Sequence, residues 1–354
     1  MVTGRFVRAW GRGFKGLGPD AHGGPERPFH FVQMADTQLG MEAMFQPAGA
    51  AGRQAFGWAQ ELALMRRAAE EVNRLRPAFA IVCGDLVNEY PPEESGASPA
   101  AADGELRARQ ERDFKEVMDL VDPEIPLLCV CGNHDVGNRP NARTIRRYTD
   151  SFGDDYFAFW CHGVKCLVVN SQLWKDDSDC EDLRRNMDEW LERELEVEEG
   201  AQPRRILVFS HIPPFINEPD EKDEYFNLDR GLRHNLLTKF AAKGAVAWFC
   251  GHYHRNAGGV YRAGDGRELE VVVTGAVGTQ IVDKPGGEPL GLSGIGGHLI
   301  GEECSGLRVV RVSQDGVKHE WRTFAELRAS AAQAENGRQD SARSRSRSPK
   351  PAAL

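Results

Sequence analysis

Short, almost uninterrupted apolar runs recur along this chain, and they constrain its fold more than any other feature. Runs of about four to eight apolar residues, rich in β-branched and aromatic side chains, are typical of strands that are covered on both faces. The expected strands are FHFVQMA (29–35), AFAIVC (78–83), PLLCVC (126–131), VKCLVV (164–169), RILVFS (205–210), AVAWFC (245–250), ELEVVV (268–273) and LRVVRV (307–312).

Amphipathic segments lie between these strands. Residues 53–75 carry an apolar stripe at helical spacing, and Pro77 follows to end the helix. Further helices are expected over 105–121, 181–198 and 228–242, and surface loops over 90–104 and 281–301. Strands that alternate with helices indicate an α/β fold with helix-covered sheets.

The two ends of the chain differ from its middle. Residues 1–28 are rich in Gly and Arg, and from residue 338 the chain reads as an Arg-Ser repeat. Such segments bury too little apolar surface to offset the entropy lost on ordering. We therefore expect disorder over 1–28 and 328–354 and a folded domain over 29–327. Other roles for these ends remain open. The first segment could be a targeting peptide. The tail could be phosphorylated, could direct the protein to the nucleus, or could contact a kinase or another partner.

Composition excludes several classes of function. The net charge of −9 argues against nonspecific nucleic-acid binding, because an acidic surface repels a phosphate backbone. No run of about eighteen apolar residues, the length of a membrane span, is present. The eight cysteines form no C-x-x-C motif, and several lie in apolar runs, so we expect buried thiols in a reducing compartment, the cytoplasm.

Metal-capable side chains directly follow five of the expected strands. In chain order they are Asp36, Asp85, Asn133, His211, and His252 with His254. The carboxyl ends of strands in an α/β sheet meet at one crevice, so these side chains can converge. Taken singly, an Asp or Asn after a strand is usually a turn residue or a helix cap. The succession of Gly-Asp, Gly-Asn-His-Asp and Gly-His-x-His, each directly after an apolar strand, favours a metal site instead.

The chemistry of these donors suggests which ions they would hold. Three oxygen donors and three imidazoles suit borderline divalent ions such as Fe, Zn or Mn. The set suffices for two ions if one carboxylate bridges them at the roughly 3.5–4 Å spacing of two-metal hydrolases, and we assign that position to Asp85. The glycines before Asp85, Asn133 and His252 allow sharp turns and the close approach of an anion.

These motifs resemble those of the calcineurin-like metallophosphoesterase superfamily. The resemblance spans about residues 29–325, through Asp36-Thr37-Gln38, Gly84-Asp85, Gly132-Asn133-His134-Asp135, His211 and Gly251-His252-Tyr253-His254. It implies a four-layer α-β-β-α sandwich, in which two mixed β-sheets are flanked by helices.

Within the superfamily, the chain is similar to the family of calcineurin-like phosphoesterase domain-containing protein 1. The similarity lies in Asp154-Asp155-Tyr156-Phe157, Tyr225-Phe226-Asn227-Leu228 and the run HYHRNAGG at 252–259. It implies a protein serine/threonine phosphatase, with a phosphoprotein or phosphopeptide as substrate.

The resemblance also implies a ligand set for each ion. One ion would be held by Asp36, Gln38, Asp85 and His254, and the other by Asp85, Asn133, His211 and His252. Gln38 stands where most of the superfamily has a metal-binding His. Because an amide oxygen is a weaker ligand than imidazole, this position implies weaker binding or a harder ion such as Mn or Mg.

The implied reaction is hydrolysis of a phosphate monoester by a hydroxide that bridges the two ions. His134 is expected to act as general acid for the leaving oxygen, with Asp135 fixing its tautomer. A guanidinium fork matches phosphoryl oxygens, so Arg255 and Asn256 are expected to clamp them. The residues expected to line the substrate side are Tyr225, Phe226 and Asn227.

The sequence also allows two other functions. The same metal geometry serves phosphodiesters, so a phosphodiesterase for cyclic nucleotides or other small molecules is the second hypothesis. The third is a weakly active metal-binding scaffold that contacts partners through its tail, suggested by Gln38 and the Arg-Ser repeat.

Overall fold

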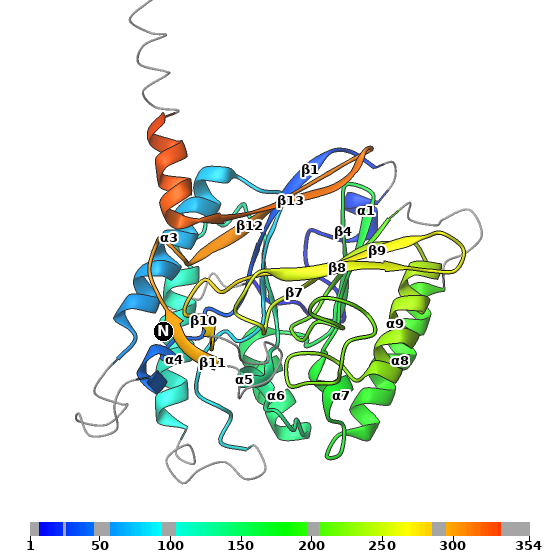
Figure 1. The fold of residues 1–354 in the computed structure, drawn as a ribbon, viewed down its shortest axis with the longest axis horizontal. Coiled ribbons are helices and arrows are strands. Elements are labelled where there is room, and N and C mark those ends of the chain that lie inside the picture. Colours follow the sequence, from blue (N-terminus) through cyan, green and yellow to red (C-terminus); the bar gives the residue numbers. More distant parts are fainter. Residues whose placement is uncertain are drawn as a thin grey trace, which may run out of the picture.

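Two β-sheets form the centre of the protein, seen here in a computed structural model that describes residues 7–23, 26–45, 57–93, 104–196, 205–284 and 295–333 (Figure 1). The first sheet has the order β13 (Gly316–Thr323), β12 (Gly306–Ser313), β1 (Phe29–Met34), β2 (Ala80–Cys83) and β3 (Leu127–Val130). The second has the order β4 (Phe157–Cys161), β5 (Val164–Val168), β6 (Ile206–Phe209), β7 (Ala245–Cys250), β9 (Glu268–Val273) and β8 (Ala257–Arg262).

Both sheets are mixed, but the strands at their centres run parallel. β1, β2 and β3 pair in parallel, and so do β5, β6, β7 and β9. β12 and β13 are antiparallel additions to the first sheet, and β4 and β8 are antiparallel edges of the second. The carboxyl ends of the parallel strands within each sheet therefore point to one side.

Aromatic side chains fill the space between the two sheets. Phe31 of β1 stacks on Phe79 with 4.6 Å between ring centroids, and it meets Phe209 of β6 and Phe249 of β7 edge-on at 5.7 Å and 5.4 Å. All four rings are fully buried. The next residue, Val32, points the opposite way and belongs to the core under the helices, as the alternation of a strand requires.

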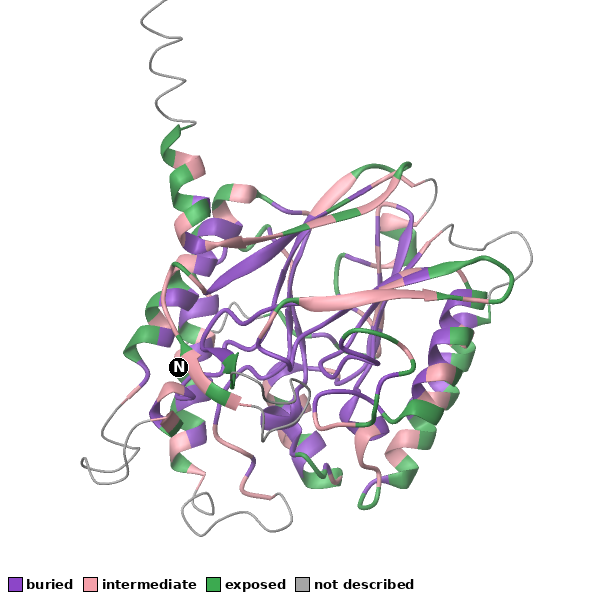
Figure 2. Ribbon diagram, in the orientation of Figure 1, coloured by how far each residue is buried: buried purple, intermediate pink, exposed green. Residues whose placement is uncertain are grey.

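Helices cover the outer faces of the sheets. α3 (Ala59–Leu75) and α4 (Glu105–Met118) lie over the first sheet, while α8 (Glu181–Leu195) and α9 (Arg230–Ala242) lie over the second (Figure 1). The shorter helices are α1 (Pro19–His22), η1 (Glu42–Phe45), α5 (Asn133–Val136), α6 (Ala142–Phe152), α7 (Gln172–Lys175) and a helix over 324–333. Figure 2 shows the central strands buried and the outward faces of the helices exposed. The expected four-layer α-β-β-α sandwich is confirmed.

The elements expected from the sequence largely match the structure. All eight expected strands form, and the four expected helices lie over 59–75, 105–118, 181–195 and 230–242. Residues 53–56, 94–103 and 197–198, on which some of these predictions fall, lie outside the described residues. Within the described part of the chain, no helix is both long and apolar enough to span a membrane.

The expected loop over 281–301 requires a correction. β10 (Gln280–Asp283) pairs with β11 (Ile295–Leu299) as a separate two-stranded sheet, and residues 285–294 between them lie outside the described residues. The sequence of β11, IGGHL, has too many glycines to give a strand pattern. β11 is a strand because it pairs with β10, and its own sequence does not predict that pairing.

The expectation of disorder at both ends also requires a correction. Residues 7–23 lie against the protein, with Ala9, Phe14 and Leu17 buried. Arg12 contributes to this placement, because its guanidinium bonds Asp155 at 2.9 Å and stacks over the Tyr156 ring. At the other end, residues 328–333 continue the helix that begins at 324, whereas 334–354 lie outside the described residues.

Candidate metal centre

The polar residues that follow the parallel strands meet at one edge of the two sheets. Asp36, Asp85 and Asn133 come from the first sheet, after β1, β2 and β3. His211 follows β6, and His252 and His254 follow β7, in the second sheet. All six residues are buried. Residues more than two hundred positions apart in the chain are thus neighbours, as the position of each at a strand end predicts.

Their ligand atoms form two groups that share one carboxylate. Asp36, Asp85 and His254 offer atoms that lie within 4.8 Å of one another, and so do Asp85, His211 and His252. Asp85 is common to both groups, which is the place that a carboxylate bridging two ions requires. The amide oxygen of Asn133 joins the second group, 3.1 Å from Nε2 of His211.

Each histidine of the centre turns one ring nitrogen toward a backbone carbonyl. Nδ1 of His211 donates to the Cys83 carbonyl at 2.9 Å, and Nδ1 of His254 donates to the Thr279 carbonyl at 2.6 Å. Nε2 of His252 faces the Tyr225 carbonyl at 3.4 Å. The other nitrogen of each ring is left toward the centre with a lone pair, which is the usual arrangement of metal-binding imidazoles.

Gln38 has an amide oxygen that no other group satisfies. Its Nε2 donates to Oδ1 of Asn88 at 3.2 Å and to Nε2 of His134 at 3.0 Å, which uses both amide hydrogens. Its Oε1 is buried and has no hydrogen-bond partner among the described residues. A buried, unpaired oxygen is costly, and a cation beside it would remove that cost.

The backbone at the centre adopts an uncommon conformation. Asp36, Gln38, Asp85, His252 and His254 all have positive φ, between 35° and 69°. Such angles are infrequent for residues other than glycine and often mark functional sites. Five of them in one centre indicate that the surrounding structure holds the ligands in place at some conformational cost.

Two glycines allow the carboxylates to approach. A Cβ on Gly132 would lie 2.2 Å from Oδ1 of Asp85, and a Cβ on Gly251 would lie 2.6 Å from Oδ2 of Asp36. Gly132 precedes Asn133 and makes room for Asp85 from the neighbouring strand, and Gly251 precedes His252 and makes room for Asp36 from the other sheet. These glycines were expected to let an anion approach closely, and the structure shows that they also let the carboxylate ligands approach the neighbouring backbone.

The electrostatics of the centre favour a cation. Burial raises the pKa of Asp36 well above its usual range, with His211 opposing this and Asp85 adding to it. Burial acts on Asp85 in the same direction, but His211 and His134 outweigh it and hold its pKa below the usual range. Burial lowers the pKa of His254 to about 4, so this imidazole is neutral and able to coordinate at pH 7. Burial also lowers the pKa of His252, whereas Asp85 and Asp36 outweigh burial at His211 and raise its pKa to about 9. A proton on His211 thus offsets the two close, buried carboxylates, and a divalent ion would do the same in its place.

His134 lies beside the centre, but its orientation has a different cause from the one expected. Its Nδ1 bonds the Asn88 carbonyl, and its Nε2 faces Gln38 and the Tyr90 hydroxyl, 3.2 Å away. The Asp135 carboxylate instead accepts the backbone N–H groups of Leu86 and Gly132. The expectation that Asp135 fixes the tautomer of His134 therefore requires correction, because Asn88 occupies that position.

Three of the expected substrate contacts have other partners. Arg255 pairs with Asp283 of β10 at 2.6 Å, and the Asn256 side chain accepts from Arg308, also at 2.6 Å. Asn227 is fully buried, where its amide donates to Glu221 at 2.7 Å. These contacts join loops within the protein, and the expected clamp of Arg255 and Asn256 on phosphate stays a prediction.

The other two residues of that set lie next to the centre. The Tyr225 hydroxyl accepts from Nδ2 of Asn133 at 3.1 Å, and its ring lies 5.0 Å from that of His252. The Phe226 ring lies 5.3 Å from that of His252 and is buried.

Several residues that support the centre were not expected from the sequence. They are Asn88, Tyr90, Arg107 and Asn138. Asn133 donates to the hydroxyl of Tyr90 and to Oδ1 of Asn138, both at 3.1 Å. Arg107 of α4 is fully buried and donates to the carbonyls of His134 and Asp135, at 2.6 Å and 3.0 Å. Nothing in the local sequence distinguishes these residues from ordinary surface polar groups.

Known proteins share this fold and this sequence pattern. A model of the calcineurin-like phosphoesterase family matches residues 29–256. A protein of Danio rerio described as serine/threonine-protein phosphatase CPPED1 is 39% identical over 324 residues, 91% of this chain and 93% of its own. The Homo sapiens protein of the same description is 35% identical over 327 residues, 92% of this chain and 93% of its own.

Solved structures agree at the level of the fold. The crystal structure of a dimetal phosphatase from Danio rerio superposes with a TM-score of 0.52 at 13% identity, covering 84% of this chain and 96% of that one. A purple acid phosphatase from yellow lupin seeds superposes with a TM-score of 0.55 at 11% identity, covering 86% of this chain and 53% of that one. Together with the family match and the sequence relatives, these comparisons show that the chain belongs to the calcineurin-like phosphoesterase family and is a metallophosphoesterase.

Proposed function

We propose that this metallophosphoesterase is a protein serine/threonine phosphatase that uses two divalent ions. The observation that carries the proposal is the meeting of two groups of ligand atoms that share Asp85. The description of the relatives as serine/threonine-protein phosphatases, at 35–39% identity over more than nine-tenths of the chain, supports the choice of substrate.

Each ion would have four protein ligands. One would be held by Asp36, Gln38, Asp85 and His254, and the other by Asp85, Asn133, His211 and His252. When bound, the ions would stabilise charge on the phosphate and lower the pKa of a water molecule. Fe, Zn and Mn suit the imidazole-rich set, and the unpaired amide oxygen of Gln38 favours Mn or Mg in the first position.

His134 would supply the proton that the leaving seryl or threonyl oxygen needs. Its Nδ1–H donates to the Asn88 carbonyl, so the proton in transit is carried on Nε2. Burial lowers the pKa of His134, so the neutral ring predominates at pH 7 and the proton is donated from the minor protonated form. In the neutral ring this Nε2 accepts from the Gln38 amide at 3.0 Å, and that hydrogen bond has to break when Nε2 carries the proton.

Tyr90 and Tyr225 would act as positioning residues for Asn133. Both hydroxyls and Oδ1 of Asn138 lie 3.1 Å from Nδ2 of Asn133, whose two hydrogens serve two of these three acceptors at a time. This arrangement turns the amide so that its oxygen faces His211. An amide that could rotate would present either its oxygen or its nitrogen to an ion, and only the oxygen can coordinate.

A substrate panel tests the proposal directly. Purified protein would be loaded with Mn²⁺ or Fe²⁺ and assayed on phosphoserine and phosphothreonine peptides beside bis-p-nitrophenyl phosphate, with Asp85→Asn as the background control. We expect hydrolysis of the peptides in preference to the diester, and loss of both activities in the variant. Preference for the diester would instead support a phosphodiesterase, and hydrolysis of neither would support a scaffold.

A further inference from the structure

A second group of metal-capable side chains lies away from the centre described above. His22 ends α1, Cys161 ends β4, and His162 follows in the turn to β5. One ligand atom from each lies within 4.8 Å of the others. Because β5 and β6 are parallel and this turn precedes β5, the group lies at the opposite end of the sheet from His211, which follows β6.

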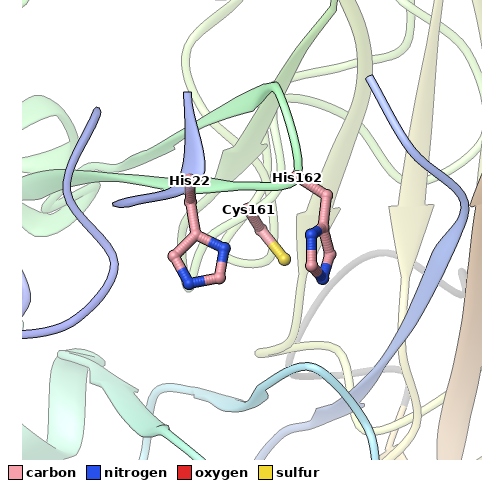
Figure 3. A group of neighbouring side chains, drawn as sticks. All are labelled: His22, Cys161 and His162. Carbon is pink, nitrogen blue, oxygen red and sulfur yellow. The ribbon is translucent and has the colours of Figure 1, made fainter. Parts of the chain in front are cut away.

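The two imidazoles flank the thiol, and each has one buried ring nitrogen without a hydrogen bond among the described residues. Figure 3 shows the Cys161 sulfur between the rings of His22 and His162. The ring centroids are 5.2 Å apart at an interplanar angle of 66°. Nδ1 of each ring is buried and has no hydrogen-bond partner in the part of the chain that the structure describes. Two unpaired nitrogens beside one thiol are unfavourable as a packing arrangement, since each loses its hydrogen bond to water.

We propose that His22, Cys161 and His162 bind one Zn²⁺ ion. Two imidazoles and a thiolate form a borderline-to-soft donor set, which selects Zn²⁺ over oxygen-preferring ions such as Mg²⁺ and Ca²⁺. Three protein ligands leave one tetrahedral position open to water. Both histidines are partly exposed, so an ion can enter from solvent.

The ion would join the N-terminal segment to the second sheet. The contacts that already hold residues 7–23 near β4 include two backbone hydrogen bonds of 2.7 Å. The Gly163 amide donates to the His22 carbonyl, and the Trp160 amide donates to the carbonyl of Leu17, which is buried. A bond from His22 through the ion to Cys161 would close this segment onto the sheet. Burial raises the pKa of the Cys161 thiol to about 12, so binding would release the thiol proton to solvent.

Cobalt substitution of the full-length protein tests the site independently of phosphatase activity. Co²⁺ bound to a thiolate gives a charge-transfer absorption in the near ultraviolet, and the candidate metal centre contains no cysteine ligand. We expect this band in the wild type, its loss in Cys161→Ser and in His22→Ala, and its retention in Cys304→Ser, the matched control. Bound zinc should fall by one equivalent per chain in the first two variants only.

The two variants keep the test decisive. If Cys161→Ser does not fold, His22→Ala decides the result, because His22 is a partly exposed residue at the end of a four-residue helix. A wild type without the charge-transfer band, or a band that survives in His22→Ala, would overturn the proposal.

Discussion

At the scale of single residues, the centre depends on which polar atoms the protein leaves without a partner. Gln38 uses both amide hydrogens within the protein and leaves its oxygen buried and unpaired among the described residues. His211 and His254 use one nitrogen each on backbone carbonyls and leave the other toward the carboxylates. These unused atoms indicate ligands more directly than the residue types do.

Replacing Gln38 by Ala should weaken the binding of one ion. The variant loses the unpaired oxygen and the donor to His134, so we expect half-maximal activity to need at least tenfold more Mn²⁺. Titration of activity against metal concentration measures this shift. If activity is low and excess Mn²⁺ does not restore any of it, Gln38 acts on something other than metal affinity.

Replacing His134 by Ala should remove the proton donor and keep the metals. A general acid contributes about two to four orders of magnitude in rate. The loss in kcat should be large for a phosphoserine peptide and smaller for p-nitrophenyl phosphate, whose leaving group needs no proton. His234→Ala, which removes a surface imidazole, is the matched control and should retain full activity. An equal loss on both substrates would argue against proton transfer from His134.

At the scale of elements, the short helix α5 is held in place by hydrogen bonds from α4. Arg107 of α4 donates to the His134 and Asp135 carbonyls and pairs with Glu111 at 2.7 Å, with its side chain fully buried. Asp135 adds bonds to the backbone N–H groups of Leu86 and Gly132. The Gly-Asn-His-Asp segment is thus positioned by two side chains, Arg107 and Asp135, whose hydrogen bonds are made to backbone groups around it.

Replacing Arg107 by Ala should destabilise the protein strongly. The substitution removes the donor to three carbonyls, those of Glu89, His134 and Asp135, and the buried ion-pair partner of Glu111. Loss of one member of a buried ion pair costs about 3–5 kcal/mol. Denaturant unfolding measures the change in free energy. Arg112→Ala on the same helix, where the side chain is 60% exposed, should change it by less than about 0.5 kcal/mol. Equal effects of the two substitutions would contradict this role for Arg107.

The elements that the sequence predicts are those whose signal is local. β1, β2, β3, β6 and β7 are apolar runs, so the sequence predicts them as strands. The polar residues directly after them are predicted to lie in the metal centre because each stands at the end of a strand. β8 has the sequence AGGVYR and β13 has GVKHEWRT, and both are strands because of their neighbours β9 and β12. Neither carries an apolar pattern that could reveal it.

The supporting residues were missed for a similar reason. Arg107 lies in a helix with many charged residues, where an arginine is normally solvated, and its burial depends on carbonyls of a distant segment. Arg12 lies in a Gly- and Arg-rich stretch, and its order depends on Asp155 and Tyr156, more than a hundred residues away. Pairings over such distances leave no mark in either local sequence.

At the scale of the whole molecule, the centre joins the two sheets. Asp36, Asp85 and Asn133 extend from the first sheet, and the three histidines extend from the second. Ions bound between them would connect the sheets at one edge and would offset the repulsion between two buried carboxylates. The metals are therefore expected to contribute to stability as well as to catalysis.

Removing the metals should lower the stability of the folded protein. An ion present at a hundred times its dissociation constant adds about 2.7 kcal/mol to the free energy of unfolding. We expect chelation to lower the thermal midpoint by several degrees, measured by calorimetry. The drop should persist in Cys161→Ser, which keeps the centre, and should shrink in Asp85→Asn. An unchanged midpoint after complete metal removal would show that the sheets do not need the ions.

The most direct measurement is an anomalous difference map from crystals grown with Mn²⁺. We expect two peaks on either side of the Asp85 carboxylate, roughly 3.5–4 Å apart, one next to Asp36 and His254 and the other next to His211 and His252. A single peak, or peaks that lie away from Asp85, would contradict a centre built around one shared carboxylate.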